Sequence, residues 1–319
     1  MRTISVFDTT INDYNLGNQI IMDSVYRVLR DIFPCDFLFK MPYQRPLGSG
    51  VINQMKKSDY AFFGGTNSLS SNVLKYNQMG FRLRDLLVPK DLILFGVGWW
   101  QYQEDPSLAT KIYLKRLLSN ELTHSVRDEY TKNKLVRLGV KSVVNTCCPT
   151  TWELTPEHCS RIPTLKADAV VTTLTDYSQS RDVDEKLLAV LFDNYQKVYY
   201  WVQGVGDYNY IQSFKKYYGR INIIPPWLEA YDNVLASEPL DYIGTRLHAG
   251  IRAIQRSKRA LVLSVDNRAA EISKDINLNA IPRDEISGIE NFIAEEHATK
   301  LNIPFCEIEK WKIQFVRYR

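Results

Sequence analysis

The 319-residue chain lacks a long apolar run. Its longest uninterrupted one, residues 92–100, has nine residues and includes two glycines. A membrane-spanning helix needs about 20 apolar residues. The first eight residues also lack the basic start and the apolar stretch of a signal peptide. We therefore expect a soluble, cytoplasmic protein without a transmembrane segment.

Cysteine and net charge are also scarce. Five cysteines, an odd number, argue against a disulfide scaffold in a chain of this length. Cys147, Cys148, His158 and Cys159 are close in sequence, but adjacent cysteines seldom match the spacing of zinc ligands, so we expect no metal site. The net charge is only +4 and forms no basic stripe, which argues against nucleic acid as a partner.

Several motifs of well-known enzyme classes are missing. Gly96 and Gly98 do not extend to a Gly-x-Gly-x-x-Gly motif, because position 101 is Gln101. The chain contains no Gly-x-x-x-x-Gly-Lys-Ser/Thr segment and no Gly-x-Ser-x-Gly elbow. These absences disfavour NAD binding, P-loop chemistry and serine hydrolysis.

The chain does contain a regular alternation of short apolar runs and longer amphipathic stretches. Strands are predicted at 3–7, 59–63, 92–97, 122–126, 142–144, 169–174, 198–202, 221–224, 240–243 and 260–265. Helices are predicted at 19–31, 108–119, 128–138, 184–195, 208–217 and 247–255. Such alternation indicates α/β structure with parallel sheets that are covered by helices on both faces.

The alternation is interrupted between Pro149 and Lys166, where three prolines occur. We therefore predict two doubly wound, Rossmann-like domains, 1–160 and 161–319, that face each other across a cleft. Near the end of the chain, Ile308, Trp311 and Phe315 have the spacing of one helical face. This pattern predicts a C-terminal helix that packs back across the domain junction.

Polar and small residues follow the predicted strands, and ligands of open α/β sheets bind beyond the carboxyl ends of the strands. We predict that these residues bind substrates: Asn15, Gly17, Asn18, Gly64, Gly65, Thr66, Asn67, Gln203, Thr245, Asp266, Asn267 and Arg268. The pair Gly64-Gly65 has two interpretations of equal weight. It either makes a tight strand-to-helix turn or lets the backbone approach an anion closely.

The segment Asp241–Ala253 is the most specific of these. Thr245 is expected to cap a helix, which places Arg246 and His248 in the first helical turn. A cation at a helix N-terminus opposes the helix dipole, so Arg246 is unfavourable there unless it binds an anion. The alternative is that Arg246 pairs with a local carboxylate such as Asp241.

Arg127, at the end of another predicted strand, has the same two interpretations. It either binds an anion or pairs with Asp128 or Glu129. Two arginines from opposite domains suit a ligand with two anionic groups.

Ser125–Glu129, Leu138–Val140 and Gly244–Ile251 resemble the polysaccharide pyruvyl transferase family, as do Asn15–Gly17 and Gly64–Asn67. The resemblance extends over about the whole chain. It implies a GT-B-like fold, phosphoenolpyruvate as donor and co-substrate, no other cofactor, and a sugar or glycan as acceptor.

With this donor, Arg127 and Arg246 match the phosphate and the carboxylate, and His248 is the candidate general acid. We expect the second domain to bind the donor. The first-domain loops around residues 15–18 and 64–67 are expected to bind the acceptor.

Two other functions remain open. A nucleotide-sugar glycosyltransferase of the same shape could use Trp201, Gln203 and Tyr208 to hold a base and ribose. A carbohydrate-binding protein without catalytic activity could use Tyr199–Trp201 as a sugar platform. The histidine beside Arg246 favours an enzyme, because binding alone does not call for it. The sequence leaves open whether the chain forms a homo-oligomer.

Overall fold

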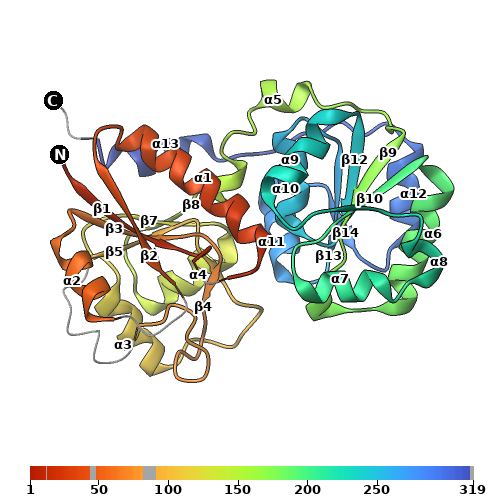
Figure 1. Ribbon diagram of the computed structural model, residues 1–319. Coiled ribbons are helices and arrows are strands. Elements are labelled where there is room, and N and C mark those ends of the chain that lie inside the picture. The colour runs from red at the N-terminus through yellow and green to blue at the C-terminus, as the bar shows by residue number, and fades with distance from the viewer. Residues whose placement is uncertain (12, 44–47, 82–90, 317–319) are drawn as a thin grey trace. The chain divides into compact units, whose positions relative to one another are not determined.

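The computed structural model describes residues 1–11, 13–43, 48–81 and 91–316. The chain forms two compact units (Figure 1). The first comprises residues 1–13, 21–152 and 303–319, and the second comprises residues 14–20 and 153–302. These bounds differ from the expected ranges 1–160 and 161–319, because a short early segment belongs to the second unit and the C-terminal segment to the first.

The first unit has a parallel sheet of order β2-β1-β3-β5. Two short parallel pairs, β4 with β6 and β7 with β8, accompany it, and a bridge between Val97 and Val126 connects β7 to the end of β5. The strands are β1 (Thr3–Asp8), β2 (Phe37–Pro42), β3 (Tyr60–Gly64), β4 (Asn67–Leu69), β5 (Leu92–Phe95), β6 (Gly98–Trp99), β7 (His124–Val126) and β8 (Val143–Asn145). The helices are α1 (Leu16–Ile32), α2 (Ser49–Lys57), α3 (Leu108–Leu117), α4 (Glu129–Leu138) and α13 (Phe305–Ile313).

Helix α13 is part of the first unit because its aromatic side chains pack on the first sheet. Ile308, Trp311 and Phe315 are all buried, as their helical spacing predicted. The Trp311 ring lies 4.6 Å from that of Phe95, and the Phe315 ring lies 5.2 Å from that of Phe62. These contacts place the last helix of the chain over strands that are more than 200 residues earlier in the sequence.

The second unit has a six-stranded parallel sheet of order β11-β10-β9-β12-β13-β14. In chain order this is 3-2-1-4-5-6, the strand order of dinucleotide-binding Rossmann folds. Its strands are β9 (Ala169–Thr172), β10 (Lys197–Trp201), β11 (Asn222–Ile224), β12 (Leu240–Gly244), β13 (Ala260–Ser264) and β14 (Ala280–Pro282).

Helices cover both faces of this second sheet. Helices α9 (Leu228–Ser237), α10 (Leu247–Gln255) and α11 (Asn267–Ile276) lie on one face, and α6 (Arg181–Asn194), α8 (Lys215–Tyr218) and α12 (Ile286–Ala294) lie on the other (Figure 1). The chain changes face between β9 and β12, which are neighbours in the sheet. The carboxyl ends of these two strands are therefore the switch point at which doubly wound sheets bind ligands.

Some local predictions are wrong. The helix expected at 208–217 is two helices, α7 (Val205–Gln212) and α8, which are separated at Ser213 and Phe214. The stretch between Pro149 and Lys166 contains a 3₁₀ turn (Pro149–Thr151) and helix α5 (Pro156–Ser160). None of the helices within the described ranges is long and apolar enough to cross a membrane.

Candidate functional site

Backbone and side-chain hydrogen bonds between threonines connect the two strand ends at the switch point of the second unit. The Thr245 Oγ1 lies 2.8 Å from the Thr175 Oγ1, and the Thr245 N–H donates to the Thr173 carbonyl oxygen at 2.9 Å. Thr245 is therefore not the helix cap that the sequence predicted. Arg246 occupies the N-cap position of α10, and its side chain makes no capping hydrogen bond.

Arg246 projects from this point toward two carboxylates. Its Nη2 lies 2.5 Å from Oδ1 of Asp207 and 3.1 Å from Oδ1 of Asp176, and its guanidinium carbon lies 5.1 Å from the centre of the Tyr177 ring. Burial raises the pKa of Asp207, Arg246 lowers it, and the neighbouring carboxylate of Asp176 raises it further. Two carboxylates therefore share one guanidinium.

Asp241, the carboxylate that the sequence suggested for Arg246, has other partners. It accepts hydrogen bonds from Arg259 Nη2 at 3.0 Å and from the Tyr195 hydroxyl at 2.7 Å. The alternative that Arg246 pairs with a carboxylate thus describes this structure, but with Asp176 and Asp207 in place of Asp241.

Asp266 and Arg268 lie at the end of the neighbouring strand β13. Asp266 caps helix α11 by accepting from the Arg268 N–H at 2.9 Å, and the two side chains form an ion pair at 2.5 Å. Arg268 also donates to the Tyr177 hydroxyl, and its guanidinium carbon lies 5.7 Å from the centre of that ring. Tyr177 therefore contacts both Arg246 and Arg268, which brings the ends of β12 and β13 into one charged cluster.

The start of helix α1 belongs to the same unit. Asn15 caps the helix, because its Oδ1 accepts from the Gly17 N–H at 3.0 Å. A Cβ placed on Gly17 would lie 3.8 Å from Oε1 of Gln203 and 3.8 Å from Cβ of His248. The predicted residues Asn15, Gly17 and Asn18 are thus grouped with Gln203 and His248, and not with the first-unit turn at residues 64–67.

Several buried polar atoms of this cluster have no hydrogen-bond partner among the described residues. They are Gln203 Nε2, Asn267 Oδ1, Arg246 Nε and Asp207 Oδ2. Gln203 and Asn267 are 2% and 8% exposed. Because an unsatisfied buried polar group costs about 1–3 kcal/mol, these atoms are suited to bonding a ligand.

Arg127 of the first unit is 1% exposed and has local partners. It donates to Asn67 Oδ1, and its Nε lies 3.3 Å from Asp128 Oδ2. Asp128 also caps α4 by accepting from the Thr131 N–H at 2.7 Å. A Cβ at Gly98 would lie 2.6 Å from Arg127 Nη2, so a glycine is needed for the arginine to lie there. The pairing with Asp128 that the sequence allowed is therefore present.

The turn at residues 64–67 has a structural reason for its glycine. Gly65 has a φ of +60°, and a Cβ there would overlap Ile21 Cγ2. Thr66 also has a positive φ, +62°. The turn leads into strand β4 and not into the expected helix. The tight-turn interpretation is therefore favoured, and the turn forms no helix N-terminus for an anion.

The family model for polysaccharide pyruvyl transferase matches residues 15–267, most of the chain and nearly the whole range of predicted site residues. The chain belongs to the polysaccharide pyruvyl transferase family. Membership implies a transferase that acts on sugars. No curated protein sequence matches the chain.

Solved structures resemble this pyruvyl transferase family member over nearly its whole length. S. aureus MnaA with UDP has a TM-score of 0.54 at 13% identity, covering 99% of this chain and 98% of that one. The UDP-GlcNAc 2-epimerase of Methanocaldococcus jannaschii has a TM-score of 0.52 at 11% identity, covering 96% of both chains. The UDP-GlcNAc 2-epimerase of Neisseria meningitidis has a TM-score of 0.52 at 12% identity, covering 99% of both chains. At these identities the likeness concerns the fold alone, and it confirms the predicted GT-B-like class with two Rossmann-like domains.

The aromatic residues considered for other functions are part of the core of this family member. Trp201 and Tyr200 are fully buried, and the Trp201 ring stacks on that of Tyr231 at 4.1 Å. Neither ring is exposed to stack on a nucleotide base or to serve as a sugar platform. Those two roles, as assigned to Tyr200 and Trp201, are wrong.

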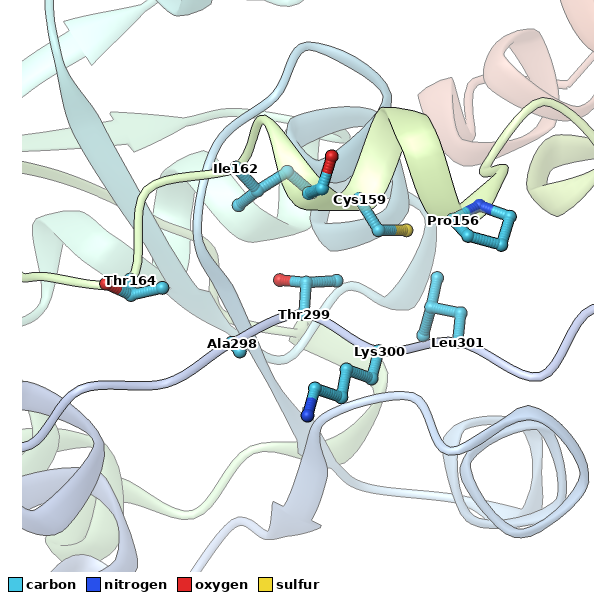
Figure 2. A pocket seen from close by; sticks show the side chains of 9 residues that line it. Pro156, Cys159, Ile162, Thr164, Ala298, Thr299, Lys300 and Leu301 are labelled. Atoms are coloured by element: carbon cyan, nitrogen blue, oxygen red, sulfur yellow. The ribbon is translucent and has the colours of Figure 1, made fainter.

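A pocket of about 360 Å³ lies elsewhere in the second unit (Figure 2). Pro156, Cys159 and Ile162 line it from the side of α5, and Thr299 and Leu301 line it from the opposite segment. Burial raises the pKa of the Cys159 thiol, so the thiol is not activated as a nucleophile. None of the predicted site residues lines this pocket.

Sequence reasoning missed Asp176, Tyr177 and Asp207. Asp176 follows strand β9 by four residues, and Asp207 lies in the first turn of the helix after β10. Both aspartates follow the carboxyl ends of predicted strands, as Arg246 does. A search for carboxylates just after each predicted strand would have found them.

Proposed function

We propose that this chain transfers pyruvate from phosphoenolpyruvate to two hydroxyls of a sugar or glycan, forming a cyclic ketal. The observation that supports this best is Arg246 at the switch point of the second sheet, in the same unit as two buried amide atoms, Gln203 Nε2 and Asn267 Oδ1, that have no hydrogen-bond partner among the described residues. Phosphoenolpyruvate carries a phosphate and a carboxylate, which are ligands for a guanidinium and an amide N–H. The acceptor atom of Asn267 suits a hydroxyl.

His248 is the proposed general acid. It lies in the first turn of α10, two residues after Arg246, and is 6% exposed. In the proposed reaction an acid protonates the methylene carbon while a sugar hydroxyl adds to the neighbouring carbon and loses its proton. The bond from that carbon to the phosphate oxygen then breaks, and a second hydroxyl adds and loses its proton to complete the ketal. The reaction balances with phosphoenolpyruvate as the sole co-substrate.

Arg127 is the proposed second cation for the donor, and Gly64, Gly65, Thr66 and Asn67 are the proposed acceptor side. The hydrogen bond from Arg127 to Asn67 links these two roles within the first unit. Substitution of Asn67 by alanine should therefore also disturb Arg127, so both donor and acceptor constants need to be measured.

Release of inorganic phosphate from phosphoenolpyruvate, measured with a panel of sugar acceptors, tests the proposal. We expect acceptor-dependent release and a new ketal methyl signal in the NMR spectrum of the product. Phosphoenolpyruvate should also raise the melting temperature, because it binds the native state. A larger rise with UDP- or GDP-sugars, together with no phosphate release for any acceptor, would contradict the proposal and favour a glycosyltransferase.

A further inference from the structure

A short turn covers the guanidinium of Arg246. The 3₁₀ turn η3 (Asp176–Ser178) follows strand β9 and supplies both the Asp176 carboxylate, 3.1 Å from Arg246 Nη2, and the Tyr177 ring. With these contacts and Asp207, the Arg246 side chain is only 11% exposed. Both carboxylates contact Nη2 of Arg246, so a ligand that binds this nitrogen must replace one of them.

The charges in this cluster identify the partner that can leave. One guanidinium faces two carboxylates, so an anionic ligand added to this arrangement would meet a net negative charge. Asp207 is 1% exposed, and it also accepts from the Asp176 N–H at 3.1 Å, which fixes it from two sides. The Asp176 side chain is 36% exposed, and its bond to Arg246 is longer. Asp176 is the carboxylate that can move into solvent.

Gly206 makes room for Asp176 at this position. A Cβ at Gly206, in the first turn of α7, would lie 2.8 Å from Asp176 Cγ and closer still to Oδ2. Real Cβ atoms do not approach other atoms so closely, so any side chain here would push the carboxylate away. The φ of Gly206 is not in the left-handed region, so alanine fits the backbone.

We propose that Asp176 is a displaceable internal anion. Its carboxylate holds Arg246 in the free protein, and the anionic group of the donor takes its place when the donor binds. The choice of phosphoenolpyruvate as the donor rests on the proposed function, but the exchange at Arg246 does not. Asp176 is thus a determinant of donor affinity that acts by competition.

Calorimetric titration of the full chain, with phosphoenolpyruvate and with inorganic phosphate separately, tests this. Asp176→Asn removes the competing charge, and Gly206→Ala keeps the charge but displaces it. Both variants should bind the two anions more tightly, by roughly tenfold, which lies within the usual range of coupling between sites. Asp182→Asn, an exposed carboxylate on α6, removes the same charge without touching Arg246 and should bind as the wild type does.

The outcomes separate this proposal from the proposed function. Tighter phosphate binding in both variants, with no binding of phosphoenolpyruvate to any form, would support the exchange and contradict the pyruvyl donor. Unchanged or weaker binding of both anions in Asp176→Asn and Gly206→Ala would overturn the exchange. Failure of every form to bind either anion would overturn it as well. An equal gain in anion affinity in Asp182→Asn would show that any lost negative charge has the same effect, and it would overturn the exchange at Arg246.

Discussion

His124 should make the protein less stable in mild acid. Its Nδ1 lies 3.2 Å from the Leu94 backbone nitrogen, and its Nε2 lies 2.9 Å from the Ser119 carbonyl oxygen. A backbone N–H can only donate and a carbonyl can only accept, so Nδ1 is the bare nitrogen and Nε2 carries the proton. The ring is fully buried and neutral, and a second proton would break the bond from Leu94.

The size of the effect follows from the pKa. Burial lowers the pKa of His124 from 6.5 to about 4. Below pH 6.5 the unfolded chain therefore takes up a proton that the folded chain does not. The pKa of His124 differs by about 2.5 units between the unfolded and the folded chain. At about 1.4 kcal/mol per unit, this difference contributes about 3 kcal/mol to the free energy of unfolding. This contribution is present above pH 6.5 and is lost as the pH falls to about 4.

Urea unfolding of the wild type and of His124→Asn between pH 7.5 and 4.5 measures this contribution. Asparagine keeps an acceptor near the position of Nδ1 but does not titrate. The wild type should be more stable at pH 7.5, and its advantage should shrink by about 2 to 3 kcal/mol by pH 4.5. The other three histidines are present in both proteins, so their contributions cancel in the difference. Parallel stability curves would refute the burial and tautomer assigned to His124.

Two further predictions concern the sites themselves. His248→Gln should lower turnover by roughly 10²- to 10⁴-fold while the melting temperature and the affinity for phosphoenolpyruvate change little, because only the acid is lost; a folded variant with wild-type turnover would end the general-acid role. Gly98→Ala should reduce the free energy of unfolding by about 1–3 kcal/mol, because its Cβ displaces the buried Arg127. Gly219→Ala, whose Cβ would have no atom within 4 Å, is the matched control, and equal losses in urea unfolding would contradict the tight fit at Arg127.

The elements of the second unit were predictable where the local pattern was strong. The apolar run at 240–243 is strand β12, and the 3.6-residue spacing of Leu247, Ile251 and Ile254 marks helix α10, whose bounds match the prediction. Strand β2 was not predicted, because Phe37–Pro42 is an edge strand whose side chains show no clean alternation of burial. Edge strands lack the buried faces that produce a pattern in the sequence.

The partners of Arg246 were not predictable, because they depend on strand order. Asp241 is near Arg246 in sequence, but it lies at the beginning of β12, whereas Arg246 follows its end. Asp176 and Asp207 are 70 and 39 residues away, and they meet Arg246 because β9 pairs with both β10 and β12. No local pattern records which strands are neighbours. The residue types at the strand ends therefore predicted where the charged cluster lies, but not which carboxylates pair with Arg246.

The placement of helix α13 has a consequence for the order in which the protein folds during synthesis. The first unit includes the C-terminal segment with Trp311 and Phe315, whereas the last residue of the second unit is Asn302. During synthesis the residues of the second unit therefore leave the ribosome before the last helix of the first unit does. Until then the faces of Phe62 and Phe95 that α13 covers stay exposed on the nascent chain. A chain truncated before Trp311 would retain every strand of the second sheet. Its first sheet would lack the aromatic side chains that cover Phe62 and Phe95.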